Sequence, residues 1–287
     1  MKYLITGASG TLGQLVVEEA LTKVDPADLI LVTRSPAKLE AFAERGAEVR
    51  KGDFDDPESL RTAFAGADRM LLISTDAVGN RVAGHRNAID AARAAGVGFI
   101  AYTSVVNPVE ESPVAVNPDH RETERLLAES GIAYTALRNA LYTDMEIPAA
   151  QGAIATGRYV TNRGEGRVAS VSRADCARIA AAALVADRDL ETHYDVTGPA
   201  ALTAEESAAI YAEVGGTPVE TVLVDDETFI AGLVETGIPE EMARVIASFG
   251  QGIREGYSGD TSDAVERLTG RAPESVKEVL KRVSSPT

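Results

Sequence analysis

The feature that most constrains the fold is a glycine-rich turn near the N-terminus. An apolar run at residues 3–5 leads directly into T-G-A-S-G-T-L-G at residues 6–13, and a helical pattern follows at once. In such a strand–turn–helix, Gly7 can take the tight backbone angles and Gly13 lets the helix pack close to the strand. Gly10 lets a pyrophosphate approach the main chain, where the helix N-terminus presents free N–H groups. The turn therefore predicts a dinucleotide site, and the alternative is a glycine-rich loop without a ligand. The residues expected to bind the cofactor here are Gly7, Ser9, Gly10, Thr11, Leu12 and Gly13.

The first half of the chain alternates strand and helix patterns with short connections. Strand patterns lie at residues 2–6, 29–33, 48–51, 69–73, 99–103 and 133–137. Helical patterns lie between them at residues 12–23, 36–45, 57–64, 78–95 and 118–129. Strands such as M-L-L-I at residues 70–73 are continuous apolar runs, which is typical of a parallel sheet covered on both faces. Residues 1–141 are therefore predicted to form a Rossmann-like, doubly wound parallel sheet of the α/β class that binds NAD(P).

The regular alternation fades after about residue 142. A helical pattern at residues 173–186 leads to a strand pattern at 192–196, so residues 173–197 are expected to rejoin the main sheet. Further helical patterns lie at residues 204–214, 227–236, 239–249, 262–268 and 274–283, with an apolar run at 219–224 among them. Residues 142–287 are thus predicted to form mainly a smaller, mostly helical C-terminal cap that binds the substrate.

The charge and the hydropathy of the chain disfavour several partners. A net charge of −16 argues against a nucleic acid, whose phosphates require basic patches, and it disfavours an anionic membrane surface. No apolar stretch approaches the roughly 20 residues of a membrane span. The first strand begins too close to the N-terminus to leave room for a signal peptide. We therefore expect a cytoplasmic protein with no membrane span, and the sequence leaves a homodimer open.

Cysteine and histidine usage gives no sign of a metal site. Cys176 is the single cysteine, so an internal disulfide is impossible and a reducing compartment is the simpler assumption. Its helical surroundings favour a small buried apolar residue over a reactive thiol. The three histidines and Cys176 are widely separated, so no metal ligands are expected.

The end of the second strand indicates which dinucleotide binds. NAD sites usually place an Asp or Glu there, to accept a hydrogen bond from the ribose 2′-hydroxyl. This chain instead continues V-T-R-S-P-A-K, with Arg34 at the strand end and Lys38 one turn later. Arg34 can form a forked contact with a 2′-phosphate and Lys38 can add a point charge. The pattern predicts NADP(H) over NAD(H), and the alternative is that both are solvated surface charges.

Two further strand ends are expected to contact the cofactor. Asp53 and Phe54 follow the third strand, where they could bind the exocyclic amine of adenine and cover its ring. Asp53 is alternatively a turn or N-cap residue. Ser74 and Thr75 end the fourth strand and should pass close to the cofactor ribose, because the strand ends converge there.

Five segments together resemble a known family. T-G-A-S-G-T-L-G, V-T-R-S-P-A-K, G-D-F, F-I-A-Y-T-S and Y-T-A-L-R-N-A-L-Y are similar to the NmrA-like atypical short-chain dehydrogenase/reductases. Within that group the chain looks most like the type 2 NAD(P)H:quinone oxidoreductases and the triphenylmethane reductases. T-N-R-G-E-G at residues 161–166 and S-V-S-R at 170–173 also match that subgroup. The likeness covers nearly the whole length.

The chain departs from the wider superfamily at its catalytic pair. Most members carry Tyr-x-x-x-Lys, with tyrosine as general acid and lysine on the nicotinamide ribose, and no tyrosine here is followed four residues later by lysine. With E-R-L-L at residues 124–127 as the anchor, the lysine position falls on His120 and the tyrosine position on Val116. His120 is thus expected to bind the ribose or to protonate the product, and the alternative is a surface histidine.

The resemblance implies roles for residues at two later strand ends. Ser104 stands where the superfamily has its catalytic serine, directly after Thr103, and without the tyrosine it is expected to act on the substrate or only to line the pocket. Asn139 and Leu141 lie in the segment that replaces the usual proline-containing turn beside the nicotinamide, where backbone groups can fix the carboxamide. Tyr142 is expected either over the substrate mouth or as a half-buried packing residue.

The missing general acid narrows the chemistry. Reducing an isolated ketone creates an alkoxide, for which a positioned acid typically contributes a factor of about 10²–10⁴. A quinone or a cationic dye spreads the incoming charge over a conjugated system and can take its proton later. The resemblance and this argument predict an NADPH-dependent reductase of quinones or similarly conjugated aromatic acceptors. Two alternatives remain open: an NmrA-like redox sensor without catalysis, and a tailoring oxidoreductase acting on an aromatic natural product.

Overall fold

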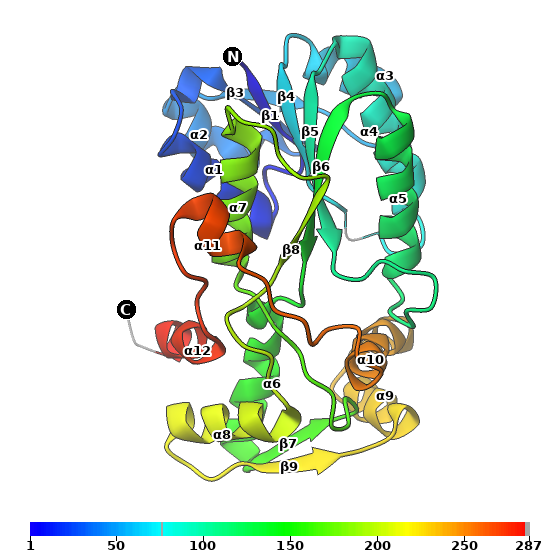
Figure 1. Cartoon of the computed structure of the whole chain (residues 1–287), viewed down its shortest axis with the longest axis vertical. Coiled ribbons are helices and arrows are strands. Elements are labelled where there is room, and N and C mark those ends of the chain that lie inside the picture. The colour runs from blue at the N-terminus through cyan, green and yellow to red at the C-terminus, as the bar shows by residue number, and fades with distance from the viewer. Residues whose placement is uncertain (76, 285–287) are drawn as a thin grey trace.

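A seven-stranded parallel sheet forms the centre of the molecule (Figure 1). The computed structural model describes residues 1–75 and 77–284. The strand order is β3-β2-β1-β4-β5-β6-β8, and every neighbouring pair is parallel. The strands are β1 (Tyr3–Ile5), β2 (Leu29–Thr33), β3 (Glu48–Lys51), β4 (Arg69–Leu72), β5 (Phe99–Val105), β6 (Ala133–Asn139) and β8 (His193–Val196). The order reverses between β1 and β4, which confirms the predicted doubly wound sheet and places its switch point there.

Helices cover both faces of this sheet (Figure 1). Ile5 and Leu71 point into an apolar cluster on the face of α1 and α7, whereas Leu4 and Met70 point into a second cluster under α3, α4 and α5. The strands are therefore apolar on both faces, as their continuous apolar runs predict. The covering helices are α1 (Thr11–Leu21), α3 (Pro57–Phe64), α4 (Arg81–Ala95), α5 (Asn117–Glu129), α7 (Arg173–Val185) and α11 (Ala264–Thr269).

Most of the elements after β6 that do not cover the sheet form a cap at the opposite end from the N-terminus (Figure 1). They are α6 (Thr143–Thr156), β7 (Arg158–Thr161), α8 (Ala204–Gly215), β9 (Glu220–Leu223), α9 (Asp226–Glu235), α10 (Glu240–Arg254) and α12 (Val276–Ser284). β7 and β9 pair in parallel as a separate two-stranded sheet. The cap has its own small apolar clusters, of which the larger is built around Tyr159 and Tyr211.

Local backbone chemistry explains where the elements differ from the sequence patterns. The helix expected at residues 36–45 is a 3₁₀ turn (Pro36–Leu39) followed by the short helix α2 (Glu40–Glu44). Helix α4 begins only at Arg81, because Gly79 has a φ of +80°. The sequence patterns give no helix at residues 143–156, where the structure has α6, because Pro148 lies inside this helix and interrupts the helical pattern. The mostly helical cap thus also contains β7 and β9.

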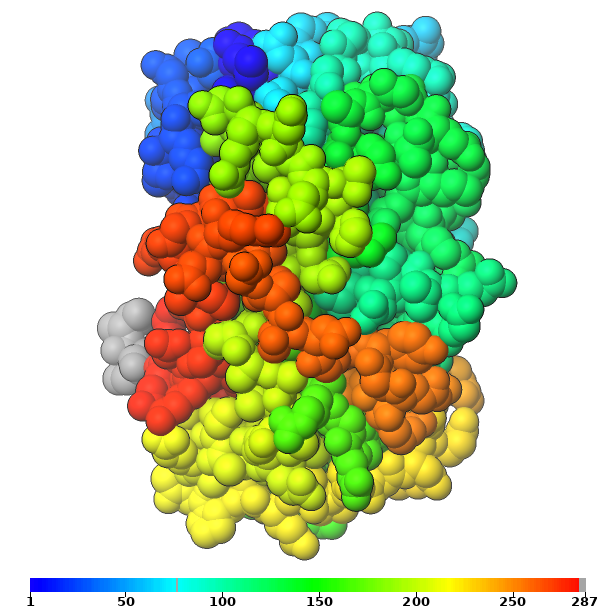
Figure 2. All heavy atoms as spheres, in the orientation of Figure 1, coloured from blue at the N-terminus to red at the C-terminus, as the bar shows by residue number. Residues whose placement is uncertain are grey.

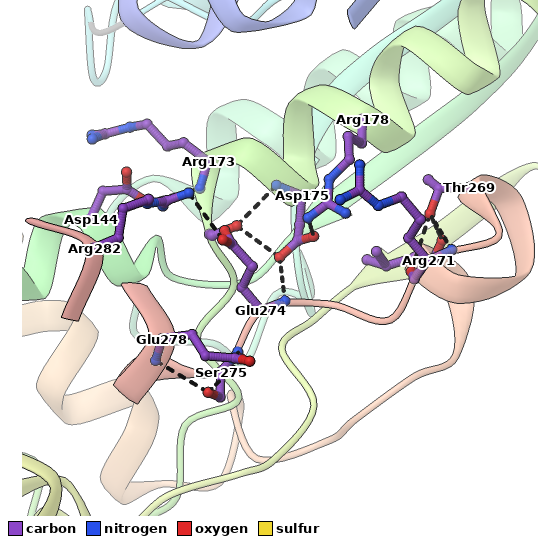
Figure 3. Close-up of polar contacts among 12 residues, drawn as sticks. Asp144, Arg173, Asp175, Arg178, Thr269, Arg271, Glu274, Ser275, Glu278 and Arg282 are labelled. Carbon is purple, nitrogen blue, oxygen red and sulfur yellow. Dashed lines mark hydrogen bonds and ion pairs between the residues drawn. The ribbon is translucent and has the colours of Figure 1, made fainter. Parts of the chain in front are cut away.

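The C-terminal segment is fastened to α7 (Figure 3). The Asp175 carboxylate is fully buried, pairs with Arg178, and accepts hydrogen bonds from Ser172 Oγ at 2.7 Å and from the Glu274 backbone N–H at 2.8 Å. Glu274 lies two residues before α12, which packs on α6 and α8 of the cap. Figure 2 shows the orange-to-red segment running from the cap across one face to the sheet domain and then, in red, back to the yellow cap. Asp175 therefore ties the last helix to the sheet domain.

Candidate active site

The residues expected to bind a dinucleotide gather in one cleft. It has a volume of about 550 Å³ and follows the ends of β1, β2, β3 and β4 at the switch point. Its lining includes Gly7, Ser9, Gly10, Thr11, Leu12, Gly13, Arg34, Lys38, Asp53, Phe54, Ser74 and Thr75. Thr103, Ser104, His120, Asn139, Leu141 and Tyr142 do not line it. The cleft therefore gathers the residues expected from the glycine turn and the ends of β2, β3 and β4, but not the cofactor-binding or catalytic residues expected from β5, α5 and the end of β6.

The glycine turn has the geometry that its sequence requires. Gly7 has a φ of +61°, which L side chains rarely adopt, and its carbonyl accepts from the Gly10 N–H at 2.9 Å. A Cβ on Gly13 would stand 2.2 Å from the Gly7 carbonyl oxygen, so only glycine lets α1 approach the strand this closely. Gly10 caps α1 without a side-chain hydrogen bond, which leaves the N–H groups of the first turn facing the cleft for an anion.

Gly10 and Gly13 should respond differently to substitution by alanine. Gly13→Ala should lower the free energy of unfolding by about 1–3 kcal/mol, because its Cβ meets backbone atoms that cannot move aside. A Cβ on Gly10 would lie 3.3 Å from the Gly7 carbonyl oxygen, a tight but tolerable contact. Gly10→Ala should therefore weaken NADPH binding while costing less stability. Denaturant titration and cofactor titration of both variants measure this, and equal stability losses would contradict it.

The end of β2 presents free positive charge to the cleft. Arg34 and Lys38 are exposed, line the cleft, and form no ion pair with any residue that the structure describes. Thr33, just before Arg34, binds the glycine turn through a 2.6 Å contact between its Oγ1 and Ser9 Oγ. The strand end and the turn are thus held together, with two unneutralised cations beside them.

The end of β3 supplies a carboxylate and an aromatic ring. Asp53 Oδ1 accepts from the Asp55 N–H at 3.2 Å, which is the turn contact that its alternative role predicts, and Asp53 still lines the cleft. Phe54 lies edge-on against His85, with ring centroids 6.0 Å apart. A Cβ on Gly84 would stand 2.9 Å from Phe54 Cβ, so α4 fixes the ring in position.

His120 lies inside a buried network. The residue is 5% exposed, so the alternative of a surface histidine is wrong. Its Nε2 lies 2.8 Å from Arg81 Nη1 and its Nδ1 lies 2.8 Å from the Tyr102 hydroxyl. A guanidinium only donates, so Nε2 accepts, and the neutral ring donates from Nδ1 to Tyr102. Burial, followed by the charge of Arg81, holds the pKa of His120 well below its ordinary value. The geometry therefore gives no support to His120 as a proton donor.

Arg81 is a buried cation of the cleft that the sequence analysis did not identify. Its side chain is 5% exposed, lines the cleft beside Ser74 and Thr75, and has Nε 3.4 Å from Asp119 Oδ2. The same Asp119 oxygen accepts from the Gly79 N–H at 2.7 Å, so one carboxylate holds both the guanidinium and the preceding turn. Arg81 is the first residue of α4, where the helix dipole disfavours a cation. That unfavourable placement is the signal that could have identified it.

The buried histidines should make the protein sensitive to acid. Burial lowers the pKa of His85 to about 3, and that of His120 is also lowered. Because these values lie below those of the unfolded chain, the unfolded state binds more protons as the pH falls below about 6.5. The free energy of unfolding should therefore drop by about 2 kcal/mol per histidine between about pH 7 and pH 5.

Denaturant titrations at both pH values measure this drop in the free energy of unfolding. Replacing the exposed His193 by Asn should leave it unchanged, whereas an undiminished drop in His85→Asn would contradict this account.

The hydroxyls at the end of β5 are engaged inside the protein. Thr103 Oγ1 accepts from the Ser74 N–H at 2.8 Å, which joins β5 to the cleft-lining end of β4. Ser104 Oγ donates to Glu124 Oε1 at 2.6 Å, and Glu124 in turn pairs with Arg138 at 2.7 Å. The hydroxyl of Ser104 is thus held by a salt-bridged carboxylate. This geometry gives no support to Ser104 as a catalytic residue.

The end of β6 leaves a buried acceptor without a partner. Asn139 is 4% exposed, its Nδ2 donates to the Tyr142 hydroxyl at 3.1 Å, and its Oδ1 has no partner. Tyr142 is half-buried against the apolar cluster of α1 and α7, with the Arg173 guanidinium 5.2 Å from its ring centroid. Burial raises the pKa of Tyr142, so its phenol is a poor acid. The position of Tyr142 therefore agrees with its alternative role as a half-buried packing residue. Leu141 lines a second, small cavity beneath α10.

Other expected features can be placed briefly. Cys176 is 1% exposed within α7, and burial raises the pKa of its thiol, as expected for an apolar role. Among residues 1–75 and 77–284, no three His, Cys, Asp or Glu side chains gather as metal ligands. None of the described helices combines the length and the apolar character that crossing a bilayer requires.

Comparison with known proteins identifies the family. A family model described as NAD(P)H-binding matches residues 7–187, which include the whole cleft. The chain belongs to this NAD(P)H-binding family. Escherichia coli quinone oxidoreductase 2 is 37% identical over 280 residues, covering 97% of each chain. The NAD(P)H azoreductase of Xenophilus azovorans is 28% identical over 278 residues, covering 97% of this chain and 96% of the relative.

Solved structures give the same relationship. The NADPH-dependent quinone oxidoreductase of Escherichia coli, complexed with NADPH, superposes with a TM-score of 0.94 at 35% identity, covering 99% of this chain and 100% of the other. The Citrobacter sp. triphenylmethane reductase complexed with NADP(H) gives a TM-score of 0.93 at 37% identity, covering 98% and 99%. The expected resemblance of this NAD(P)H-binding protein to type 2 quinone oxidoreductases and triphenylmethane reductases is confirmed.

Proposed function

We propose that this protein is an NADPH-dependent reductase that transfers hydride to a quinone or a similarly conjugated aromatic acceptor. The observation that carries the proposal is a dinucleotide cleft next to strand ends where none of the expected catalytic side chains is suited to act as a general acid. Val116 occupies the position of the superfamily's tyrosine and is 8% exposed. His120 is neutral with both nitrogens engaged, and Ser104 is held by Glu124. Such a site suits acceptors that stabilise the incoming charge themselves.

The residues present fit an NADP(H) molecule. Arg34 and Lys38 are unpaired cations suited to a 2′-phosphate, and the glycine turn is open to the pyrophosphate. Asp53 and Phe54 would hold the adenine. Two buried oxygens, Thr75 Oγ1 and Asn139 Oδ1, have no hydrogen-bond partner, and we assign them to the ribose and the carboxamide of the cofactor. This set supports NADP(H) over NAD(H).

Arg81 is proposed to replace the superfamily's lysine. His120 occupies the lysine's place in sequence, but its Nε2 accepts from Arg81, whose guanidinium lines the cleft. His120 and Asp119 thus act as positioning residues that hold Arg81, and Arg81 would bind the ribose or pyrophosphate oxygens. The cation therefore comes from α4 instead of α5.

The chain's own residues mainly orient the reaction partners. A bound reduced nicotinamide supplies the hydride. Asn139 and the strand ends of β5 and β6 would fix the face presented to the acceptor, and the apolar underside of α10 would exclude water from it. The acceptor delocalises the added charge, so its reduced form can take its proton from water after it leaves the site, and the phenol of Tyr142, whose pKa is raised by burial, is a poor donor.

The names of the relatives support the choice of acceptor. The substrates named in these relatives, a quinone, an azo compound and a triphenylmethane, share a conjugated system that delocalises charge. A cytoplasmic location and a homodimer stay predictions from the sequence.

A substrate panel tests the function. Quinones, azo dyes and triphenylmethane cations should oxidise NADPH in the presence of the protein, whereas isolated ketones should not. Tight NADPH binding without turnover of any acceptor would favour the redox-sensor alternative and contradict the proposal. Turnover of isolated ketones as fast as quinones would show that a proton donor has been overlooked.

A further inference from the structure

A second cavity lies where α10 meets the ends of β5 and β6. It has room for about one water-sized group, with a volume of about 10 Å³, and its walls are mostly apolar. Its lining is Val105, Val106, Val114, Asn117, Leu141, Phe249, Ile253, Tyr257 and Ser258. In the strand order, β5 and β6 come next to β4, whose end lines the cofactor cleft, so the cavity lies beside that cleft in the sheet order.

The cavity is held in shape by close contacts between α10 and the segment 106–116, which follows β5 (Figure 1). A Cβ on Gly252 would stand 2.4 Å from Val114 Cγ2, so glycine is needed for this approach. The Ala115 N–H donates to Ser248 Oγ at 3.0 Å. Asn107, the described non-glycine residue with a positive φ, at +47°, donates to the Tyr257 carbonyl at 2.7 Å.

One buried side-chain polar atom among the cavity-lining residues has no hydrogen-bond partner. Asn117 is 1% exposed, and its Nδ2 donates to the Asn107 carbonyl at 2.8 Å and to Ser112 Oγ at 2.7 Å. A carbonyl oxygen only accepts, so these contacts fix which end of the amide is nitrogen. Asn117 Oδ1 is therefore the acceptor left over, buried and without a hydrogen bond. A buried acceptor in this state typically costs about 1–3 kcal/mol.

We propose that this cavity is a substituent pocket of the acceptor site, in which Asn117 Oδ1 accepts a hydrogen bond from an amino or hydroxyl group on the substrate ring. The inference rests on the proposed function and deepens it by naming a substrate class. The cavity fits a single small group, so the ring itself would lie outside, over the half-buried Val105 and Leu141. A ring with a small donor satisfies Asn117, whereas one with a methyl group of similar size leaves it unpartnered.

A matched pair of ligands tests the pocket by direct binding. An aminonaphthoquinone and the same quinone with methyl in place of amino are titrated calorimetrically into the NADP⁺-saturated protein, where no turnover occurs. We expect the amino compound to bind about tenfold more tightly, because it alone partners the buried oxygen. Equal affinities would mean that a water molecule already satisfies Asn117, and would overturn the inference.

Two variants assign the preference to the oxygen itself. Asn117→Leu should abolish the tenfold preference. Ser112→Ala removes one anchor of the same amide but keeps Oδ1, so it should retain the preference. If the preference survives in Asn117→Leu, the inference is wrong. Turnover separates it from the proposed function: both quinones reduced by the NADPH form but bound equally would remove the pocket alone, whereas selective binding without reduction would remove the function alone.

Discussion

Replacing Arg34 with glutamate should lower the preference for NADPH over NADH by about two orders of magnitude in kcat/KM. Arg34 lies at the end of β2, lines the cleft, and has no ion pair with a described residue to compete for its charge. A charge-assisted contact to a 2′-phosphate is worth about 1.5–3 kcal/mol, and the substituted carboxylate would repel the same phosphate. The variant should leave the kcat/KM for NADH close to that of the unchanged protein.

The controls separate the contact from a general effect of charge. Lys38→Ala should produce a smaller change, about tenfold, because the lysine supplies only a point charge. Lys23→Glu makes the same change of net charge as Arg34→Glu outside the cleft lining, and should leave the cofactor preference unaltered. Steady-state kinetics with both cofactors measure all three. An unchanged preference in Arg34→Glu would mean that the arginine is a solvated surface charge.

Replacing Asp175 with alanine should lower the free energy of unfolding by about 3–5 kcal/mol, because it leaves a buried cation without its partner. Asp175 is fully buried and pairs with Arg178, which is 8% exposed. Burial raises the pKa of Asp175, so this carboxylate is held at the expense of its hydration. The substitution also removes the acceptor of the Glu274 N–H, which fastens the segment leading to α12 (Figure 3).

A surface pair with the same spacing gives the matched control. Asp90 and Arg93 also pair at i and i+3, but both side chains are more than half exposed. Asp90→Ala should therefore cost less than about 1 kcal/mol. Urea titrations of both variants provide the comparison. Similar losses at the two sites would contradict the view that the buried contact fastens the cap.

The glycine turn and the sheet could be predicted because their signals are local. Gly7 and Gly13 lie within eight residues of one another, and the backbone geometry of one turn requires both. The buried strands are recognisable in the sequence as continuous apolar runs. The motif T-N-R-G-E-G at residues 161–166 could be recognised in the sequence, but its structural role could not be predicted. In the structure a Cβ on Gly166 would stand 2.1 Å from the Ile253 carbonyl oxygen, so the motif seats α10 over the strand ends.

The chemistry at the strand ends could not be predicted in the same way. The sequence places His120 opposite the superfamily's lysine but does not show that Arg81, 39 residues earlier, lies between it and the cleft. Whether Ser104 faces substrate or Glu124 depends on side-chain direction at the end of β5. The unpartnered side-chain oxygen of Asn117 depends on which groups surround its amide in the fold, so the sequence does not reveal it. These are tertiary contacts, and no local pattern encodes them.

Transient kinetics test the central claim most directly. The protein is loaded with NADPH, or with NADPH deuterated at the transferred position, and mixed in a stopped-flow instrument with excess quinone. We expect the absorbance of the reduced nicotinamide to disappear rapidly in a single turnover, more slowly with deuterium, and with no requirement for an ionisable group of the protein between about pH 6 and pH 8. Bound NADPH that persists in the presence of every quinone would contradict the account.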